Sequence, residues 1–309
     1  MKRVLVTGAH GFLGRHAAAL FKKKGFEVVG IGHGHWGFEN PEDFGIDEWI
    51  EADVNQVGLS HVRGLINCVV HCAGGSSVGH SLEHPLREFQ RTVNSTVNLL
   101  EFIRIKHPAA SIIYPSSAAV YGDQPDILLS EDSELSPFSP YGFYKKIVED
   151  LCESYARNFG IPVVVIRFFS IYGAGLQKQL LWDACNKLLS GKKTVKFYGT
   201  GNETRDWIHV EDAAELIYLL SKSPSGFDIV NGGSGTRIAV KDILAMLSDE
   251  LETTVDILMG NENKPGDPKH YWANISKVQK LGWIPQVKIE DGLHEYVQWF
   301  KSHKQGIGK

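Results

Sequence analysis

Tyr141 and Lys145 are the residues whose types and spacing most clearly suggest chemistry. They stand four positions apart in Tyr141-Gly-Phe-Tyr-Lys145, which would place both side chains on one face of a helix. A free tyrosine has a pKa of about 10 and is a poor base at neutral pH. A nearby lysine ammonium favours the phenolate, and a fall of ~3 pKa units needs ~4 kcal/mol of differential stabilisation. The pair is therefore a candidate acid/base couple, although this spacing alone is common by chance.

A serine that precedes this pair could share its substrate. Ser117 lies in Ser116-Ser-Ala-Ala-Val-Tyr-Gly122, directly after an apolar run that predicts a strand over Ser111–Tyr114. It would emerge at the carboxyl end of that strand, where open α/β sheets bind ligands. Its hydroxyl can then hydrogen-bond the substrate oxygen whose proton Tyr141 exchanges. The alternative is a serine that only ends a strand in a turn.

The third candidate feature is the glycine-rich segment Gly8-Ala-His-Gly11-Phe-Leu-Gly14. Gly8 permits a tight turn, Gly11 lets a diphosphate approach the backbone, and Gly14 allows close helix packing. A helix that follows directly would point unpaired N–H groups and its positive dipole end at the phosphates. Glycines also make ordinary turns, but the position between a predicted strand and a predicted helix favours a dinucleotide site.

The elements that must position these residues follow an alternating pattern of short apolar runs and helical periodicity. Ser139 could cap, and Pro140 could open, the helix that carries Tyr141. We expect strands or helices over Arg3–Thr7, Phe12–Lys24, Glu27–Ile31, Leu65–Ala73, Val163–Phe169, His209–Leu220, Phe227–Asn231 and Asp291–Phe300. This order predicts an α/β fold, with a Rossmann-type doubly wound parallel sheet and a smaller interleaved C-terminal α/β substrate lobe. The sheet domain would span residues 1–173, completed by segments near 205–232, and the lobe would span 174–309.

Composition limits the partners of the chain. It has 309 residues, 43% hydrophobic and 22% charged, with a net charge of -4. This balance gives no reason to expect nucleic acid, and no run reaches the ~18–20 apolar residues that span a membrane. No signal peptide is evident. Cys68 and Cys72 could share a face of one strand, and buried thiols rather than a zinc site are expected. We therefore predict no metal and a cytoplasmic location.

Glycine loop, serine and Tyr-x-x-x-Lys occur in the order and spacing of a known family. With G-x-x-G-x-x-G, the chain resembles the extended short-chain dehydrogenase/reductase family of NAD(P)-dependent nucleotide-sugar epimerases, dehydratases and reductases. The resemblance covers nearly the whole chain and implies a catalytic triad of Ser117, Tyr141 and Lys145. The cofactor contacts it implies are Gly8, His10, Gly11, Phe12, Leu13, Gly14, His33, Asp53, Val54, Cys72, Ala73, Gly74, Tyr141, Lys145 and Phe168.

One departure from the family concerns the cofactor. NAD-preferring relatives carry an acidic residue at the end of the second strand, and Gly32 stands in that place. The missing carboxylate removes repulsion against a 2′-phosphate, and His33 or His35 could donate hydrogen bonds to one. NAD and NADP therefore both remain candidate cofactors, with surface loop histidines as the alternative interpretation.

The substrate side also resembles the family, with changes. Ala73-Gly-Gly-Ser-Ser-Val-Gly-His-Ser81 resembles a loop of UDP-galactose 4-epimerases, although Ser76 replaces a common lysine. In Thr204–Asp212, Arg205 would clamp the nucleotide diphosphate, for which a guanidinium is well suited. Ser170 and Thr92 each occupy a usual asparagine position. The implied substrate contacts are Ser76, Ser117, Ser170, Arg205 and Lys264.

These motifs favour a C4 epimerase of nucleotide-diphosphate sugars. Related dehydratases and decarboxylases resemble one another in carrying acidic residues at the positions of Ala118 and Ala119. An alanine cannot transfer a proton, so elimination and decarboxylation are disfavoured. The first alternative is an NADPH-dependent 4-keto nucleotide-sugar reductase, and the second is a non-catalytic NAD(P)-sensing protein on the same fold. The family also implies a homodimer through helices near Glu83–Lys106 and Tyr144–Asn158.

Overall fold

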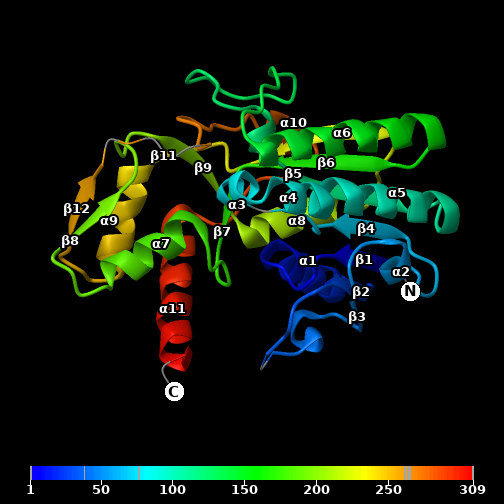
Figure 1. Cartoon of the computed structure of the whole chain (residues 1–309), viewed down its shortest axis with the longest axis horizontal. Coiled ribbons are helices and arrows are strands. Elements are labelled where there is room, and N and C mark those ends of the chain that lie inside the picture. The colour runs from blue at the N-terminus through cyan, green and yellow to red at the C-terminus, as the bar shows by residue number, and fades with distance from the viewer. Residues whose placement is uncertain (1, 38, 76, 261, 263–265, 308–309) are drawn as a thin grey trace. The chain divides into compact units, whose positions relative to one another are not determined.

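A seven-stranded parallel sheet organises the first of two units in the computed structural model, which describes residues 2–37, 39–75, 77–260, 262 and 266–307 (Figure 1). The strands are β1 (Arg3–Thr7), β2 (Glu27–Gly32), β3 (Glu48–Glu51), β4 (Cys68–His71), β5 (Ser111–Ser117), β6 (Val163–Phe168) and β10 (Phe227–Gly232). Their spatial order is β10-β6-β5-β4-β1-β2-β3, and every neighbouring pair is parallel. The order reverses beside β1, so a ligand site is expected at the carboxyl ends of β1 and β4. The predicted Rossmann-type sheet is confirmed.

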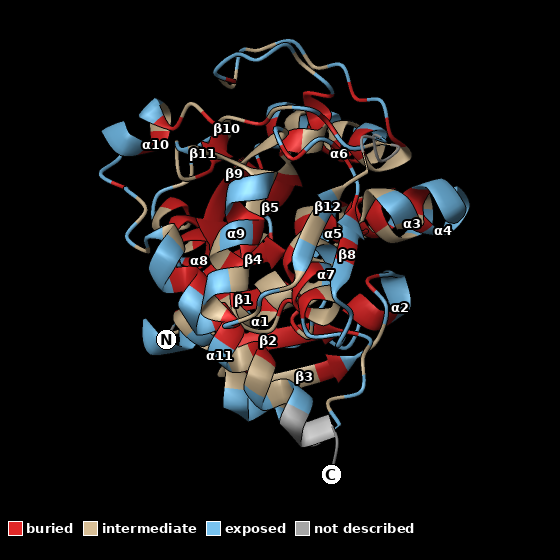
Figure 2. Ribbon diagram, turned by 90° about the vertical axis from the view of Figure 1, so that its left-hand side faces the viewer, coloured by how far each residue is buried: buried red, intermediate tan, exposed pale blue. Residues whose placement is uncertain are grey.

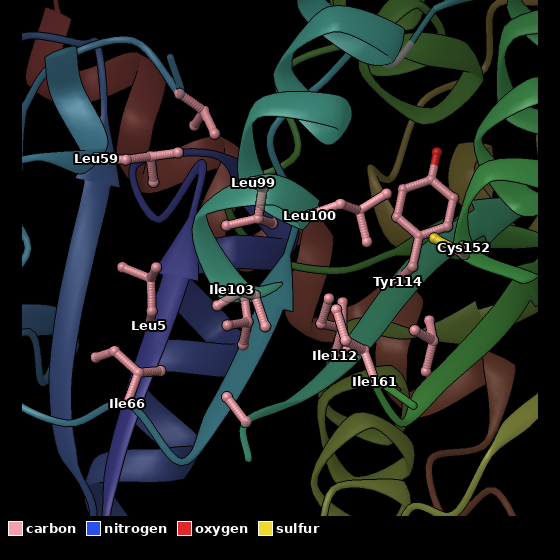
Figure 3. Close-up of a cluster of buried hydrophobic side chains, with 14 of the residues drawn as sticks. Leu5, Leu59, Ile66, Leu99, Leu100, Ile103, Ile112, Tyr114, Cys152 and Ile161 are labelled. Atoms are coloured by element: carbon pink, nitrogen blue, oxygen red, sulfur yellow. The ribbon is translucent and has the colours of Figure 1, made fainter. Parts of the chain in front are cut away.

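Helices cover both faces of this sheet. On one face, Leu99 and Ile103 of one helix and Cys152 of another pack against Leu5 and Ile112 of the strands, all nearly inaccessible (Figure 3). Burying each such aliphatic side chain contributes roughly 1.5–3 kcal/mol. The helical segments of this unit are α1 (Phe12–Lys23), η1 (Pro41–Phe44), α2 (Gln56–Leu59), α3 (Val78–Glu83), α4 (Pro85–Phe89), the π-helical η2 (Gln90–Asn94), α5 (Ser95–Lys106), η3 (Ala118–Val120), α6 (Pro140–Phe159) and most of α8 (Val210–Leu220). On the other face, α1 and α8 meet through Phe21 and Tyr218, whose ring centroids lie 5.6 Å apart.

The second unit comprises residues 123–130, 169–212 and 233–309 and mixes short strands with helices. A three-stranded sheet has the order β11-β9-β7, and β8 pairs in parallel with β12. Its elements are β7 (Ser170–Tyr172), α7 (Gln179–Leu188), β8 (Thr194–Phe197), β9 (Thr204–His209), β11 (Arg237–Ala239), α9 (Val240–Glu250), β12 (Asp256–Met259), α10 (Ser276–Lys280) and α11 (Ile289–Ile307). Residues 213–232 belong to the first unit, so the two units are interleaved in sequence. The boundary expected at residue 173 stays a prediction.

Several element ends differ from the sequence expectation. β4 is confined to Cys68–His71, because Leu65 is 66% exposed and the Asn67 side chain accepts a hydrogen bond from the Arg3 amide. At its other end the strand stops at His71, so Cys72 lies beyond it and the possible arrangement of both cysteines on one strand face is not found. α11 extends well beyond the predicted Asp291–Phe300.

Burial follows this layout. The strands of the parallel sheet are drawn mostly as buried, whereas the helices show exposed outer faces (Figure 2). Strands covered on both faces have apolar side chains on both sides, which explains the continuous apolar runs of β1 and β6. Within the described residues, none of the helices combines the length and the apolar character that a membrane-spanning segment requires.

Candidate active site

The glycine loop between β1 and α1 owes its shape to close backbone approaches. Gly8 has a φ of +66°, and its amide donates a hydrogen bond to the Ile31 carbonyl at 2.7 Å. A Cβ atom at Gly8 would lie 2.8 Å from the Ala73 amide nitrogen, and one at Gly14 would overlap the Gly8 carbonyl oxygen. Side chains do not fit at either position, so glycine keeps this loop against the ends of β2 and β4.

The start of α1 offers unpaired donors. Gly11 is the N-cap residue, and no side chain caps this helix within the described chain. In contrast, the Ser139 hydroxyl caps α6 by accepting a hydrogen bond from the Gly142 amide at 3.2 Å, as predicted. The first amides of α1, at Phe12 and Leu13, lie at the positive end of the helix dipole. These groups fit the diphosphate of a dinucleotide.

The segment after β4 lies beside the loop. Thr7 Oγ1 accepts a hydrogen bond from the Ala73 amide at 3.1 Å and lies 2.7 Å from His71 Nδ1. Burial lowers the pKa of His71 to about 3, so its ring is neutral at physiological pH. Cys72, Ala73 and Gly74 are thus held at the carboxyl end of the sheet next to Gly8, where the family resemblance placed cofactor contacts.

Two histidines, an arginine and a tryptophan lie near the end of β2. His33 is exposed, with Nε2 3.6 Å from Asp53 Oδ1. The His10 ring lies edge-on to Trp36 at 4.7 Å, and Arg15 Nη1 lies 3.2 Å from Glu39 Oε2. A Cβ atom at Gly32 would lie 3.3 Å from Trp49, so a small side chain would need only a slight shift.

Two of the expected cofactor contacts, Asp53 and Val54, differ in their surroundings. The Asp53 side chain is 73% exposed, beyond the end of β3. Val54 is 7% exposed and packs in the hydrophobic core of the first unit. Asp53 is therefore accessible to a ligand, whereas the Val54 side chain is occupied with packing.

Ser117 and Tyr141 are brought together at the end of β5. Ser117 Oγ accepts a hydrogen bond from the Ala119 amide at 3.2 Å. Burial raises the pKa of Tyr141, and the nearby Ser117 hydroxyl, acting on the phenol as a hydrogen-bond donor, lowers it. The Tyr141 amide donates to Ser81 Oγ at 3.1 Å, which fixes the first turn of α6. The described residues thus hold the phenol in its neutral form.

Lys145 lies on the same face of α6. Its Nζ donates to the Pro115 carbonyl at 2.9 Å and lies 4.7 Å from the Tyr114 ring centroid and 5.8 Å from that of Tyr141. Burial lowers the pKa of Lys145 to about 8, while Cys72 and Glu149 raise it. The ammonium is therefore close to losing its proton at mildly basic pH. Tyr144, by comparison, packs edge-on against Phe89 at 5.4 Å, away from this pair.

A buried ion pair supports β5, β6 and α6 behind the triad. Arg167 Nη2 lies 2.8 Å from Glu149 Oε2, and its Nε donates to both carboxylate oxygens. Ser116 donates to Glu149 Oε1 at 2.5 Å, and the Arg167 guanidinium also donates to the Tyr121 hydroxyl. Phe168, the next residue of β6, is buried against Gly232. This network fixes the strand ends from which Ser117 projects.

The second unit carries the residues expected at the substrate phosphates. Arg205 on β9 donates to the carbonyls of Thr204 and Lys269 at 2.9 and 3.3 Å, and burial lowers its pKa. Ser170 begins β7 and pairs with Trp207 of β9. Neighbouring Asp206 accepts hydrogen bonds from the amides of three residues, at Ser234, Gly235 and Ala273. Ser76 and Lys264 lie outside the described residues.

The structure adds residues that the motifs did not single out. Glu88 on α4 is only 3% exposed, and its Oε1 lies 2.7 Å from His80 Nδ1. Its charge raises the pKa values of both Tyr141 and Lys145. Thr92, noted as a departure from asparagine, accepts from the Gly75 amide at 2.9 Å within the π-helical turn. An acidic residue in a short helix gave no sequence signal that it would be buried.

A parallel doubly wound sheet, an uncapped glycine loop and a Ser–Tyr–Lys cluster at its carboxyl edge define a dinucleotide-dependent enzyme class. Residues 4–232 match the NAD dependent epimerase/dehydratase family, and the chain belongs to this family. The resemblance to the extended short-chain dehydrogenases/reductases is thereby confirmed.

Named relatives and solved structures resemble the chain over nearly its full length. The UDP-glucuronate 4-epimerase of Thermodesulfobacterium geofontis is 27% identical, over 97% of this chain and 96% of its own length. A UDP-N-acetylglucosamine 4-epimerase from Methanobrevibacter ruminantium, in complex with UDP-N-acetylmuramic acid, has a TM-score of 0.89 at 28% identity, covering 98% of this chain and 99% of that one. The UDP-glucuronic acid 4-epimerase of Bacillus cereus, solved with UDP-glucuronic acid and NAD, has a TM-score of 0.89 at 29% identity, covering 97% and 99%.

Proposed function

We propose that this protein is a nucleotide-sugar 4-epimerase that oxidises C4 of the sugar and reduces it again from the other face. The observation that carries the proposal is the placement of the Ser117 hydroxyl beside the Tyr141 phenol at the carboxyl end of β5, with Lys145 on the same face of α6. The named relatives that cover the whole chain, which are epimerases of UDP-sugars, support the same reaction class.

The residues of the triad divide the proton chemistry among them. Ser117 orients the 4-hydroxyl oxygen, and Tyr141 removes its proton and later returns it. Lys145, anchored on the Pro115 carbonyl, holds an ammonium near the phenol and favours its ionised form. Bound NAD supplies the hydride acceptor and a positive ring that further favours the phenolate. Because burial alone raises the pKa of Tyr141, ionisation would depend on these cations.

The same segment argues against elimination. Ala118 is buried, and neither Ala118 nor Ala119 carries a group that can transfer a proton. For the substrate, we propose that Arg205 binds the diphosphate, with Ser170, Ser76 and Lys264 as further contacts. A planar guanidinium donates two parallel hydrogen bonds to phosphate oxygens, which suits this role.

A second candidate function is a 4-keto nucleotide-sugar reductase that consumes NADPH. Gly32 supports it, because no carboxylate stands at the end of β2 to repel a 2′-phosphate. His33 is exposed there, and His10 and Arg15 lie close to the same loop. Glu39 pairs with Arg15, and Asp53 Oδ1 lies 3.6 Å from His33 Nε2, so acceptance of both NAD and NADP is the expected behaviour.

A homodimer through α5 and α6 belongs to the same proposal. Ile105, Phe143, Ile147 and Phe159 are large apolar side chains on these helices, each at least 37% exposed. Helices with such faces can pair across a two-fold axis in a four-helix bundle. Sedimentation velocity on the purified protein would test this point.

The decisive experiment incubates the enzyme with a panel of UDP-, GDP- and dTDP-sugars, with NAD or NADPH. Formation of a C4 isomer without net cofactor consumption would establish an epimerase. Stoichiometric NADPH oxidation with a 4-keto sugar would establish the reductase instead. Tyr141→Phe should lose most turnover, about 10²-fold or more for loss of an acid/base group, while binding NAD normally. If neither reaction occurs across the panel, a non-catalytic NAD(P)-binding role is the remaining function.

A further inference from the structure

The guanidinium of Arg15 is held on three sides near the start of α1. Its Nε and Nη2 donate to the His10 carbonyl in the glycine loop at 3.3 and 3.0 Å. Its Cζ lies 4.4 Å from the centroid of the Phe44 ring and 5.7 Å from that of Trp36. Its Nη1 lies 3.2 Å from Glu39 Oε2. The cation is therefore fixed against the glycine loop, and of these partners only Glu39 carries a charge.

The aromatic side of this arrangement is anchored by the segment that follows β2. Trp36 stacks on Phe44 with ring centroids 5.5 Å apart, and it meets the His10 ring edge-on at 4.7 Å. A Cβ atom at Gly34 would lie 2.5 Å from His10 Nδ1, so a larger residue there would displace the His10 ring. The segment after β2 and the glycine loop thus form one packed surface, which sets the direction of the Arg15 side chain.

This surface lies where a doubly wound domain binds the adenosine ribose of its cofactor. Near the end of the second strand, an acidic residue accepts the ribose 2′-hydroxyl of NAD, or an arginine binds the 2′-phosphate of NADP. In this chain β2 ends at Gly32, and Arg15 contacts both the glycine loop and the segment after β2. The Arg15 side chain is 17% exposed and that of Glu39 is 51% exposed. Glu39 can therefore leave Arg15 without disturbing buried groups.

A half-exposed carboxylate is a replaceable partner for this guanidinium. Such an ion pair contributes little to stability, because water and salt screen it. A phosphate monoester carries more negative charge than a carboxylate and has three acceptor oxygens, so it is a strong ligand of a guanidinium. Since Nε and Nη2 already donate to the His10 carbonyl, a phosphate and Glu39 would compete for the side of Nη1.

We propose that Arg15 binds the 2′-phosphate of NADP and that Glu39 is an intramolecular competitor that sets the balance between NADP and NAD. With NAD, the Arg15–Glu39 pair stays closed. With NADP, the phosphate takes the place of the Glu39 carboxylate at Nη1. This proposal rests on the proposed acceptance of both cofactors, but not on the proposed reaction at the sugar.

The test measures binding of two ligands that differ only in the 2′-phosphate, 2′,5′-ADP and 5′-AMP. Calorimetric titration of the full-length protein, freed of any co-purified dinucleotide, gives the ratio of their dissociation constants. Glu39→Gln removes the competing charge and should shift this ratio by about tenfold in favour of 2′,5′-ADP, the contribution of one charge-assisted hydrogen bond. Glu42→Gln removes an exposed carboxylate from neighbouring η1, and it should leave the ratio within about twofold because a screened distant charge contributes little.

A variant of Arg15 shows whether the effect of Glu39 acts through this cation. Arg15→Met keeps an apolar side chain against Phe44, and it should shift the ratio by about tenfold or more in favour of 5′-AMP. In the Arg15→Met background, Glu39→Gln should no longer change the ratio, which a double-mutant cycle reports. Equal weakening of both ligands by Arg15→Met would mean that Arg15 only supports the glycine loop, and the proposal would be wrong. Because Glu39 is half-exposed, Glu39→Gln should fold normally, and an unchanged ratio in that variant would overturn the proposal by itself.

These outcomes are independent of the sugar chemistry. A protein that shows the expected ratios but converts no nucleotide sugar would overturn the proposed epimerase and leave the role of Arg15 and Glu39 intact. An active epimerase whose ratio is the same in Glu39→Gln and in the wild type would do the reverse.

Discussion

Glu149 and Glu88 are two carboxylates of the first unit that are buried to the same extent but differ in their hydrogen-bond partners. Each residue is 3% exposed. Glu149 receives hydrogen bonds on both oxygens from Arg167 and a further one from Ser116. Glu88 has one close partner, His80, and its second oxygen has none among the described residues.

The difference in pairing predicts a difference in what each carboxylate contributes to stability. The paired Glu149 holds the strand ends in place, and removing one partner of such a buried ion pair strongly destabilises the fold. A buried carboxylate with one unpaired oxygen has fewer hydrogen bonds to lose, so its removal should cost the fold much less. Both carboxylates raise the pKa of Lys145, Glu149 more than Glu88.

The largest expected effect comes from breaking the paired carboxylate. Arg167→Leu leaves Glu149 buried without its counter-ion, and the free energy of unfolding should fall by about 3–5 kcal/mol. Denaturant titration measures this change. Glu88→Gln, measured in the same way, should change stability by less than about 1 kcal/mol. Equal losses for the two variants would mean that the carboxylates have the same role.

The next largest effect on stability is expected at Gly75, which leaves room for Glu88 Oε2. Gly75→Ala places a methyl group where Glu88 Oε2 lies, and overpacking should cost about 1–3 kcal/mol of folding free energy. In the double variant with Glu88→Ala, the space is free and most of that cost should disappear. A double-mutant cycle of unfolding free energies reports the coupling. Additive losses would show that the two residues do not compete for one space.

The protonation of Lys145 gives an effect on activity alone. Its pKa is lowered to about 8, so the ammonium is present below that pH and is lost as pH rises through it. Activity should therefore fall about tenfold per pH unit well above pH 8, instead of only near the usual lysine value. A pH profile of kcat/KM up to pH 10 measures the limb. A flat profile across this range would exclude a role for the charged lysine.

The smallest expected effect is on cofactor preference, at Gly32, where relatives that prefer NAD carry an acidic residue. Gly32→Asp restores an acid at the end of β2 and should weaken binding of NADP relative to NAD by about tenfold, or 1.4 kcal/mol. Calorimetric titration of the two cofactors, or of 2′,5′-ADP against 5′-AMP, measures the ratio. Asn158→Asp, which adds the same charge at an exposed position in the last turn of α6, is the control. An unchanged ratio in Gly32→Asp would remove the β2 end from cofactor selection.

Local sequence signals account for the parts of the structure that were predicted. Glycines with special backbone needs fixed the loop between β1 and α1, and Ser139 with Pro140 fixed the start of α6. Such signals act within a few residues, so they can be read without knowing the fold. The placement of Tyr141 and Lys145 on one helix face and of Ser117 at a strand end could be predicted for the same reason, and their catalytic role stays a prediction.

The environment of Glu88 depends on contacts that the sequence does not show. Its burial arises where α4 meets α3 and the Gly74–Gly75 turn, and the enclosing π-helical turn has no reliable sequence signature. The predicted start of β4 was wrong for a similar reason, because apolar Leu65 was assigned to the strand although its side chain is exposed. An apolar or acidic residue type specifies its burial only through its neighbours in space.

The most direct test of the proposed reaction follows a label at C4. The enzyme is incubated with UDP-glucose deuterated at C4, and with the corresponding labelled UDP-glucuronate and UDP-N-acetylglucosamine, while absorbance at 340 nm is recorded. We predict that one of these sugars is converted into its C4 isomer with the deuterium retained at C4 and no net change in NADH. Isomerisation that loses the label to solvent, or turnover only with stoichiometric consumption of NADPH, would contradict an epimerase that returns its own hydride.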